Sequence, residues 1–405
     1  MFLKSFVKSG TLTIIDPDGG TSSHGCGEPE VTLRIHDPGW PNRSLLRPAL
    51  GVGEGYMDGA YTIEEGDIQS FLDLCFQNTK WGSGHWFLGL VSAFERRGKR
   101  LYELNPVSRA RKNAAHHYDL SDEFFDMFLD SRRQYSCAYF MSPDDDIETA
   151  QEQKLRHIAA KLLLEPGMTV LDIGCGWGGL AMYLAERTGV KVTGITLSQE
   201  QLKVAQDRAR RAGLADRVEF RLQDYREVPE QFDRIISVGM FEHVGTNHYR
   251  TFFRKVRECL KPDGVAVLHS IGRADGPGVT NAWMRKYIFP GGYSPALSEV
   301  MPVIEREQLF ATDIEILRLH YADTLKRWLE RFAERRDEVR EIYDERFCRM
   351  WEFYLAASQA VFRHGGHVVF QVQMSRQVNA VPMTRDYIQD WERSPKSDGK
   401  LDKIA

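Results

Sequence analysis

The chain has 405 residues, a length typical of two or three domains, and its 42% hydrophobic content is enough for a sizeable core. A net charge of -4 argues against general binding of nucleic acid, because domains that bind nucleic acid are usually basic. The six cysteines lack CxxC spacing, which indicates free thiols in a reducing compartment and argues against a zinc site or other bound metal.

Residues 1–100 are predicted to form a small α+β domain. The segments Thr11–Ile15 and Val31–Ile35 alternate apolar and polar residues as strands do, and a Gly-rich loop separates them. The apolar part of residues 1–15 is too short for a secretory signal. The stretch Gly51–Gly59 is rich in turn residues. Asp67 is a candidate N-cap for a helix, since four apolar residues follow it at helical spacing: Ile68, Phe71, Leu72 and Cys75.

An aromatic and apolar stretch at residues 81–94 precedes a basic segment at Arg96–Lys112, which holds seven basic residues and one acidic residue. Such a pair can sit on an anionic membrane surface. The alternative is a buried helix followed by a solvated one. No stretch approaches the roughly 20 apolar residues of a membrane-spanning helix. We therefore expect a basic linker at residues 101–118 and a cytoplasmic protein that is peripheral at the inner face of the membrane.

From about residue 150 onward, predicted strands and helices alternate. The pattern predicts a doubly wound α/β domain at residues 119–378, interrupted by a helical insertion at about 275–360. We expect the polar tail at residues 379–405 to be loosely ordered. The predicted strands are 169–173, 191–195, 218–222, 234–238, 264–268 and 367–375, and the predicted helices are 152–164, 180–187, 199–211 and 248–260.

The first predicted strand of this domain ends in a glycine turn, VLDIGCGWGG, at residues 170–179. A strand that is followed by a glycine turn and the start of a helix allows backbone amides to approach a nucleotide-like ligand closely. A dinucleotide site would need an acidic residue at the end of the second strand, where this chain has Gly194, Ile195 and Thr196. Asp224 follows the third strand instead, where it can accept from an adenine amino group. This layout favours S-adenosylmethionine (SAM) over a dinucleotide.

Four motifs, the first of them within the glycine turn, follow one another in the chain: GCGWGG at 174–179, TLSxxQ at 196–201, FEHVG at 241–245 and LHSIG at 268–272. With QYSCAYF at 134–140, they resemble the cyclopropane-fatty-acid synthases and the related mycolic-acid methyltransferases. The resemblance runs from about Tyr118 to Arg376 and implies a class I SAM methyltransferase fold of the α/β type. That fold is Rossmann-like, with a seven-stranded, mostly parallel sheet and a helical lipid-site insertion, here beside the small N-terminal domain.

The resemblance implies transfer of a methylene unit from SAM to the cis double bond of an unsaturated membrane phospholipid, which forms a cyclopropane ring. The base would be a bound bicarbonate. Carried over residue by residue, the bicarbonate site falls on Cys137, Glu242, His269, the backbone of Ile271, and Tyr321. Donors such as the His269 ring and the Tyr321 hydroxyl suit a small anion, and Glu242 can orient His269 or accept a proton.

The same resemblance places SAM along the glycine turn and the ends of the neighbouring strands. Gly174, Gly176 and Gly178 would face its methionine and ribose, with Asp172 orienting the turn. Thr196, Leu197 and Gln201 would hold the ribose. The adenine edge would meet Gln223 and Asp224, and Tyr135 and Ser136 would close over the methionine end.

Plainer interpretations exist for the same residues. Cys137 can be a small buried hydrophobe, and Tyr321 can be core packing. His243 is interpreted as structural, and the pair His116 and His117 as structural or hinge residues. Two other functions stay open. One is a lipid methyltransferase that ends the carbocation as a methyl branch or a methylene, and the other is a lipid-binding protein with a relic SAM fold. The sequence leaves the oligomeric state open, although a homodimer would suit a membrane substrate.

Overall fold

A computed structural model describes residues 2–79 and 120–394. The aromatic stretch at 81–94, the basic segment Arg96–Lys112 and the histidines at 116 and 117 lie outside the described residues. The chain divides into two compact units. Unit 1 comprises Met1–Arg97, Val279–Pro290 and Tyr321–His367, and unit 2 comprises Gly98–Gly278, Gly291–His320 and Val368–Ala405. The boundaries of 100 and 119 expected from the sequence stay a prediction.

Unit 1 contains a four-stranded sheet in the order β2-β1-β3-β4, formed by β1 (Gly10–Ile15), β2 (Thr21–Cys26), β3 (Glu30–Ile35) and β4 (Tyr61–Glu65). β1 and β3 pair in parallel, and the other pairs are antiparallel. Its helices are α1 (Phe2–Phe6), α2 (Trp40–Leu46), α3 (Pro48–Met57), α4 (Ile68–Gln77), α12 (Ala282–Tyr287), α14 (His320–Glu334, from Tyr321 onward), α15 (Arg336–Ile342) and α16 (Glu345–His364).

The predicted strands of unit 1 and the Asp67 cap are confirmed. The Asp67 carboxylate accepts a hydrogen bond of 2.7 Å from the Ser70 amide at the start of α4. The Gly-rich loop expected after β1 instead contains the strand β2, whose polar residues are mostly exposed. A polar strand with one neighbour gives no alternating apolar pattern, and this explains why the sequence did not indicate it.

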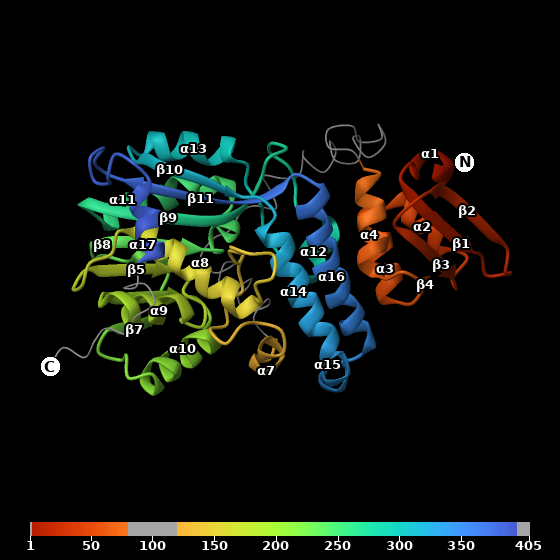
Figure 1. Cartoon of the computed structure of the whole chain (residues 1–405), viewed down its shortest axis with the longest axis horizontal. Coiled ribbons are helices and arrows are strands. Elements are labelled where there is room, and N and C mark those ends of the chain that lie inside the picture. The colour runs from red at the N-terminus through yellow and green to blue at the C-terminus, as the bar shows by residue number, and fades with distance from the viewer. Residues whose placement is uncertain (1, 80–119, 395–405) are drawn as a thin grey trace. The chain divides into compact units, whose positions relative to one another are not determined.

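Unit 2 contains a seven-stranded sheet in the order β10-β11-β9-β8-β5-β6-β7 (Figure 1). The pairs β5–β6, β5–β8, β6–β7 and β8–β9 are parallel, and β10 runs antiparallel to β11. The sheet is mostly parallel, as expected. Its strands are β5 (Thr169–Ile173), β6 (Lys191–Thr196), β7 (Val218–Leu222), β8 (Phe232–Val238), β9 (Leu260–Arg273), β10 (Phe310–Leu317) and β11 (His367–Ser375, from Val368 onward).

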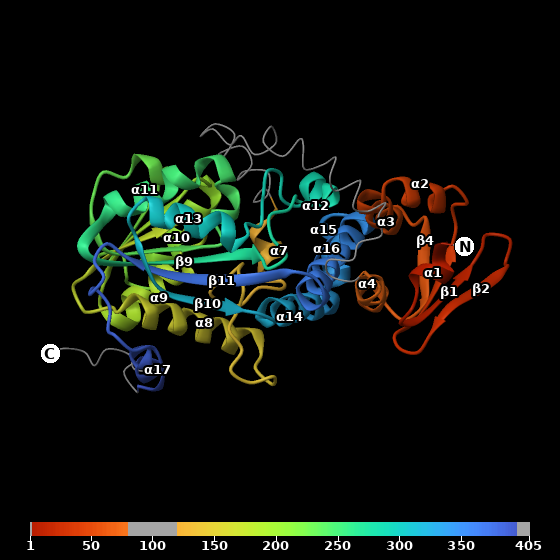
Figure 2. The same cartoon turned by 90° about the horizontal axis from the view of Figure 1, so that it is seen from above.

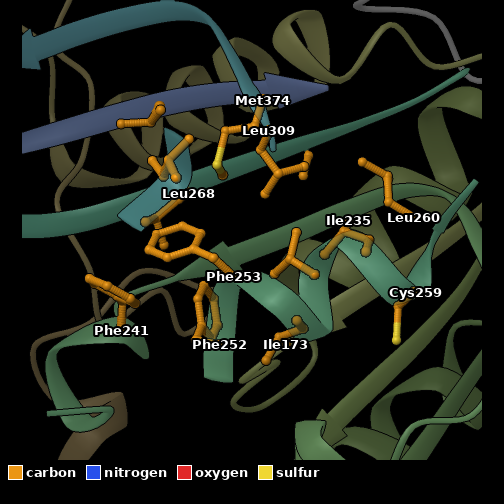
Figure 3. Packing of buried hydrophobic residues seen from close by; sticks show 14 of the residues in the cluster. Ile173, Ile235, Phe241, Phe252, Phe253, Cys259, Leu260, Leu268, Leu309 and Met374 are labelled. Carbon is orange, nitrogen blue, oxygen red and sulfur yellow. The ribbon is translucent and has the colours of Figure 1, made fainter. Parts of the chain in front are cut away.

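Helices cover both faces of this sheet (Figure 2). Neighbouring residues of β5 point to opposite faces, so that Val170 packs with α8 and α9, while Leu171 packs with α11 and α13. Figure 3 shows the second of these clusters, in which Ile173 of β5 lies with Phe252 and Phe253 of α11. The helices of unit 2 are α7 (Asp122–Asp126), α8 (Ile147–Leu162), α9 (Gly179–Thr188), α10 (Gln199–Arg211), α11 (Tyr249–Cys259), α13 (Leu297–Arg306) and α17 (Asp386–Arg393), with the short 3-10 turns η1 (Tyr225–Glu227), η2 (Phe241–His243) and η3 (Thr246–His248).

Two expectations for the C-terminal part are wrong. The insertion at 275–360 is not wholly helical, because β10 lies inside it and forms the edge of the sheet. The tail is not loosely ordered throughout, since α17 buries Ile388 and its Glu392 contacts the His157 ring at 2.6 Å. Within residues 2–79 and 120–394, no helix is both long enough and apolar enough to span a bilayer.

Candidate active site

The glycine turn lies between β5 and α9, and its conformation depends on glycine. Gly174, Gly176 and Gly178 have φ values of 86°, 54° and 80°, which side chains other than glycine seldom adopt. A Cβ added at Gly174 would lie 2.7 Å from Met240, and one at Gly178 would lie 2.4 Å from the Phe220 ring. A Cβ at Gly176 would have no neighbour within 4 Å. The turn is therefore packed on two sides and open at its middle glycine.

A cavity lies over this turn and the carboxyl ends of β5, β6 and β8, where ligands bind in open α/β sheets. Of the eleven residues predicted to bind the cofactor, all except Gly178 line it. Those that line the cavity are Tyr135, Ser136, Asp172, Gly174, Gly176, Thr196, Leu197, Gln201, Gln223 and Asp224. Gly178 contributes by packing, as the start of α9.

Hydrogen bonds hold the polar wall of the cavity in place. The Thr196 hydroxyl donates to the Gln201 side chain at 3.0 Å, and the Ser198 amide donates back to the Thr196 hydroxyl at 3.2 Å. The Asp224 carboxylate is buried and pairs with Arg226 at 2.8 and 2.7 Å. Arg226 therefore fixes the orientation of the acid that is expected to meet adenine.

Asp172 is the buried acid at the base of the cavity. Burial raises the pKa of its carboxyl to about 7, while the nearby Lys154 ammonium opposes that rise. Its Oδ2 has no hydrogen-bond partner among the residues that the structure describes. A buried carboxylate oxygen without a donor is costly, so the site fits a ligand that carries a donor or a positive charge, as SAM does.

The segment Gln134–Ser136 forms another wall of the cavity and is held by side chains of α8. The Gln151 amide donates to the backbone carbonyl of Ser136 at 2.9 Å, and the Lys154 ammonium donates to the Ser136 hydroxyl at 3.0 Å. Lys154 is fully buried, and desolvation lowers its pKa to about 8. The charged side chain of Lys154, on α8, thus positions Ser136, which is predicted to close over the methionine end of SAM.

A second group of predicted residues lies beyond the cavity lining. Glu242 accepts a hydrogen bond of 2.7 Å from the Ile271 amide through Oε1, while its Oε2 has no partner within the described part of the chain. Burial raises the pKa of Glu242 to about 7. The buried His269 ring contacts the Gln371 side chain at 3.1 Å, and Cys137 is also buried. Glu242 and Ile271 are brought into direct contact, as a shared site requires.

Tyr321 belongs to unit 1. Its ring packs on Phe362 at 4.8 Å and edge-on to Trp328 at 5.9 Å between centroids. His243, which we interpreted as structural, lines the cofactor cavity of unit 2. Sequence reasoning also passed over Arg226 and Trp177, both of which line that cavity. Their place directly after a strand or inside the glycine turn was the signal that could have found them.

The sequence matches the family model "Mycolic acid cyclopropane synthetase" over residues 106–372. It is 40% identical over 352 residues to the cyclopropane-fatty-acyl-phospholipid synthase of Escherichia coli, and the match covers 87% of this chain and 90% of that relative. It is 35% identical over 382 residues to the tuberculostearic acid methyltransferase UfaA1 of Mycobacterium tuberculosis, covering 90% and 88% of the two chains.

Solved structures agree with these relatives. The mycolic acid cyclopropane synthase CmaA1, in complex with S-adenosylhomocysteine (SAH) and CTAB, has a TM-score of 0.63 and 33% sequence identity, and the match covers 67% of this chain and 99% of that one. The fold is thus that of the class I SAM methyltransferases. From its sheet, its glycine turn and these matches, the chain belongs to the mycolic acid cyclopropane synthetase family of SAM-dependent enzymes.

Proposed function

We propose that this enzyme transfers a methylene unit from SAM to the cis double bond of an unsaturated phospholipid acyl chain. The observation that carries the proposal is the cavity over the glycine turn, in a chain that is 40% identical to a cyclopropane-fatty-acyl-phospholipid synthase along almost its whole length. The unpartnered Oδ2 of Asp172 supports a cationic ligand in that cavity.

The proposed reaction balances without a redox partner. When SAM is bound, it supplies an electrophilic methyl group on a sulfonium. The π electrons of the double bond attack that methyl, so a C–C bond forms and the C–S bond breaks, which leaves a carbocation on the acyl chain. A base then removes a proton from the added methyl, and the electrons of that C–H bond close the ring. Positioning and the exclusion of water carry much of the rate gain.

We propose Glu242, His269, Ile271, Cys137 and Tyr321 as the residues that hold a bicarbonate ion, which would supply the base. The unpartnered Oε2 of Glu242 supports an oxyanion that carries a hydrogen there. With its pKa near 7, Glu242 can hold or release a proton at neutral pH. The face of Tyr321 can stabilise a passing cation.

A methyl-branched product is the second candidate. The relative UfaA1, 35% identical over 90% of this chain, is named as a tuberculostearic acid methyltransferase. Loss of a proton from the acyl chain would end the same carbocation as a methyl-branched alkene or a methylene, so the same base and the same cavity would serve it. A saturated methyl branch would in addition need a hydride donor.

The test is incubation of the full chain with SAM and vesicles of monounsaturated phospholipid, followed by mass spectrometry and proton NMR of the fatty acids. A gain of one CH2 with loss of the olefin protons supports the ring. A gain of CH2 with a double bond kept or moved, as in a methyl-branched alkene or a methylene, rejects the ring in favour of the second candidate. SAM binding without any gain on the lipid rejects both.

A further inference from the structure

The buried ring of His269 has a buried side-chain partner that the proposed chemistry has not used. Gln371 lies on β11, beside β9, and its Nε2 is 3.1 Å from Nδ1 of His269. Gln371 is fully buried and His269 is 2% exposed. Among the residues that the structure describes, this is the hydrogen bond recorded for the His269 ring. A polar pair at this depth is costly to build and has a defined geometry.

The contact links the tautomer of the His269 ring to the orientation of the Gln371 amide. A neutral imidazole has one N–H and one lone pair, and the partner of one nitrogen fixes the role of the other. When the Gln371 amide donates to Nδ1, that nitrogen carries the lone pair and Nε2 carries the hydrogen. With the amide reversed, Nδ1 would donate to the Gln371 carbonyl, and Nε2 would present a lone pair. An anion needs a donor, and only the first arrangement provides one.

The charges around His269 favour the neutral ring. Burial holds the pKa of His269 well below its usual range, and the charges of Lys154, Lys161 and His157, all on α8, lower that pKa further. A further positive charge on this buried ring is therefore disfavoured. His269 consequently offers an N–H from a neutral ring, and it is unsuited to take up a proton during the reaction.

We propose that Gln371 is a positioning residue that holds His269 as the neutral Nε2–H tautomer, so that His269 serves the anion as a hydrogen-bond donor and not as a base. The inference rests on the proposed function, because it is the proposed bicarbonate that needs the donor. The proton that leaves the substrate then ends on the Glu242 side of the site, away from the ring of His269.

The test is nitrogen NMR of the full chain carrying 15N-labelled histidine, with the His269 signals assigned from their loss in His269→Gln. We expect the shifts of an unprotonated Nδ1 and a protonated Nε2, unchanged from neutral to mildly acidic pH. A protonated Nδ1, or an imidazolium at neutral pH, overturns the inference whatever product the enzyme makes. The expected shifts in an enzyme that makes no cyclopropane would reject the proposed function and leave the assignment standing.

Two substitutions link the tautomer to turnover. In Gln371→Glu the carboxylate should draw the proton to Nδ1, and in Gln371→Met the preference should be lost, each lowering kcat between roughly 10- and 100-fold with unchanged SAM affinity. Gln373→Met is the matched control, since Gln373 is equally buried on β11 but donates to the Lys161 carbonyl at 2.6 Å. If Gln373→Met shifts the His269 signals as much, or Gln371→Glu keeps full turnover, the inference is wrong.

Discussion

At the scale of single residues, two buried carboxyl groups of unit 2 share one property. Burial raises the pKa of both Asp172 and Glu242 to about 7, and each has one carboxylate oxygen without a partner in the described residues. Their neighbours differ, since Lys154 opposes the rise at Asp172 and the Ile271 amide opposes it at Glu242. One acid thus lies in the cofactor cavity and fits a cation, whereas the other lies outside the lining and fits a group with a hydrogen to donate.

Glu242→Gln should lose activity and gain stability. Without an acid at this position, turnover should fall by roughly 100-fold or more. SAM affinity should stay unchanged by isothermal titration, because Glu242 does not line the described cofactor cavity. In the wild type, kcat should rise as the pH passes through about 7, where Glu242 ionises. Lost SAM binding in this variant would contradict the assignment.

The stability effect of the same substitution has a definite sign. The folded pKa of Glu242, about 7, exceeds the value of about 4.3 for an unfolded glutamate, so the folded chain holds a proton that the unfolded chain has released. The stability from this proton is complete below about pH 4 and is lost as the pH rises through about 7. Glutamine stays neutral, so at pH 8 the free energy of unfolding of Glu242→Gln should exceed that of the wild type by about 1–3 kcal/mol. The exposed Glu305→Gln is the control, and equal gains there would contradict the prediction.

At the scale of elements, the helix α3 shows how packing overrides local propensity. Its sequence holds three glycines, which is why the stretch from Gly51 looked like a turn. A Cβ added at Gly53 would lie 2.5 Å from Nε1 of Trp283, and one at Gly55 would lie 2.1 Å from Nε1 of Trp40. The glycines let indole rings lie directly against the helix backbone in unit 1. These glycines are therefore required by tertiary contacts, which a local sequence pattern does not show.

Gly55→Ala should destabilise unit 1 although alanine is the better helix former. The gain in helix propensity is about 1 kcal/mol, whereas forcing Trp40 aside costs about 1–3 kcal/mol or more. A net loss should appear in urea unfolding followed by circular dichroism. In a double-mutant cycle with Trp40→Leu, the two losses should sum to more than the loss of the double variant. An additive cycle, or a Gly55→Ala protein that is more stable, would show that the close contact is not limiting.

The elements that the sequence predicted are those with a strong local signal. Asp67 caps a helix with its own side chain, and the strands β5 to β9 carry apolar residues in runs or at alternate positions. The elements that the sequence did not predict lack such a local signal. β2 is polar and exposed, β10 alternates weakly inside a helical insertion, and α17 is polar but is held by Ile388 and by the contact of Glu392 with His157. Those elements depend on partners distant in sequence.

The site follows the same rule. Ten of the predicted cofactor residues line one cavity, because strand ends and glycine turns have a fixed relation to the ligand crevice of this fold. His243 was missed because its neighbour Glu242 carries the chemical interest, and only the fold shows which of the two side chains meets the cavity. Gln371 is separated from His269 by about a quarter of the chain, so no motif connects them.

At the scale of the whole molecule, charge is unevenly distributed along the sequence. Seven basic residues and one acidic residue occupy Arg96–Lys112 in a chain of net charge -4, directly after the aromatic stretch at 81–94. Both segments lie outside the described residues. An apolar stretch beside clustered arginine and lysine suits the surface of an anionic bilayer. We therefore propose this part of the chain as the one that brings the enzyme to its lipid.

Substituting glutamine for Arg100, Arg109, Arg111 and Lys112 should weaken sedimentation with anionic phospholipid vesicles by at least about tenfold, because each basic residue near such a surface contributes about 1 kcal/mol. Salt should reduce wild-type binding in the same direction. Turnover on detergent-dispersed lipid should persist, since the cofactor cavity is untouched. The control replaces four exposed residues around α10: Lys203, Arg210, Arg211 and Arg217. If both variants lose vesicle binding equally, net charge alone directs the enzyme to the membrane; if neither does, the docking proposal is wrong.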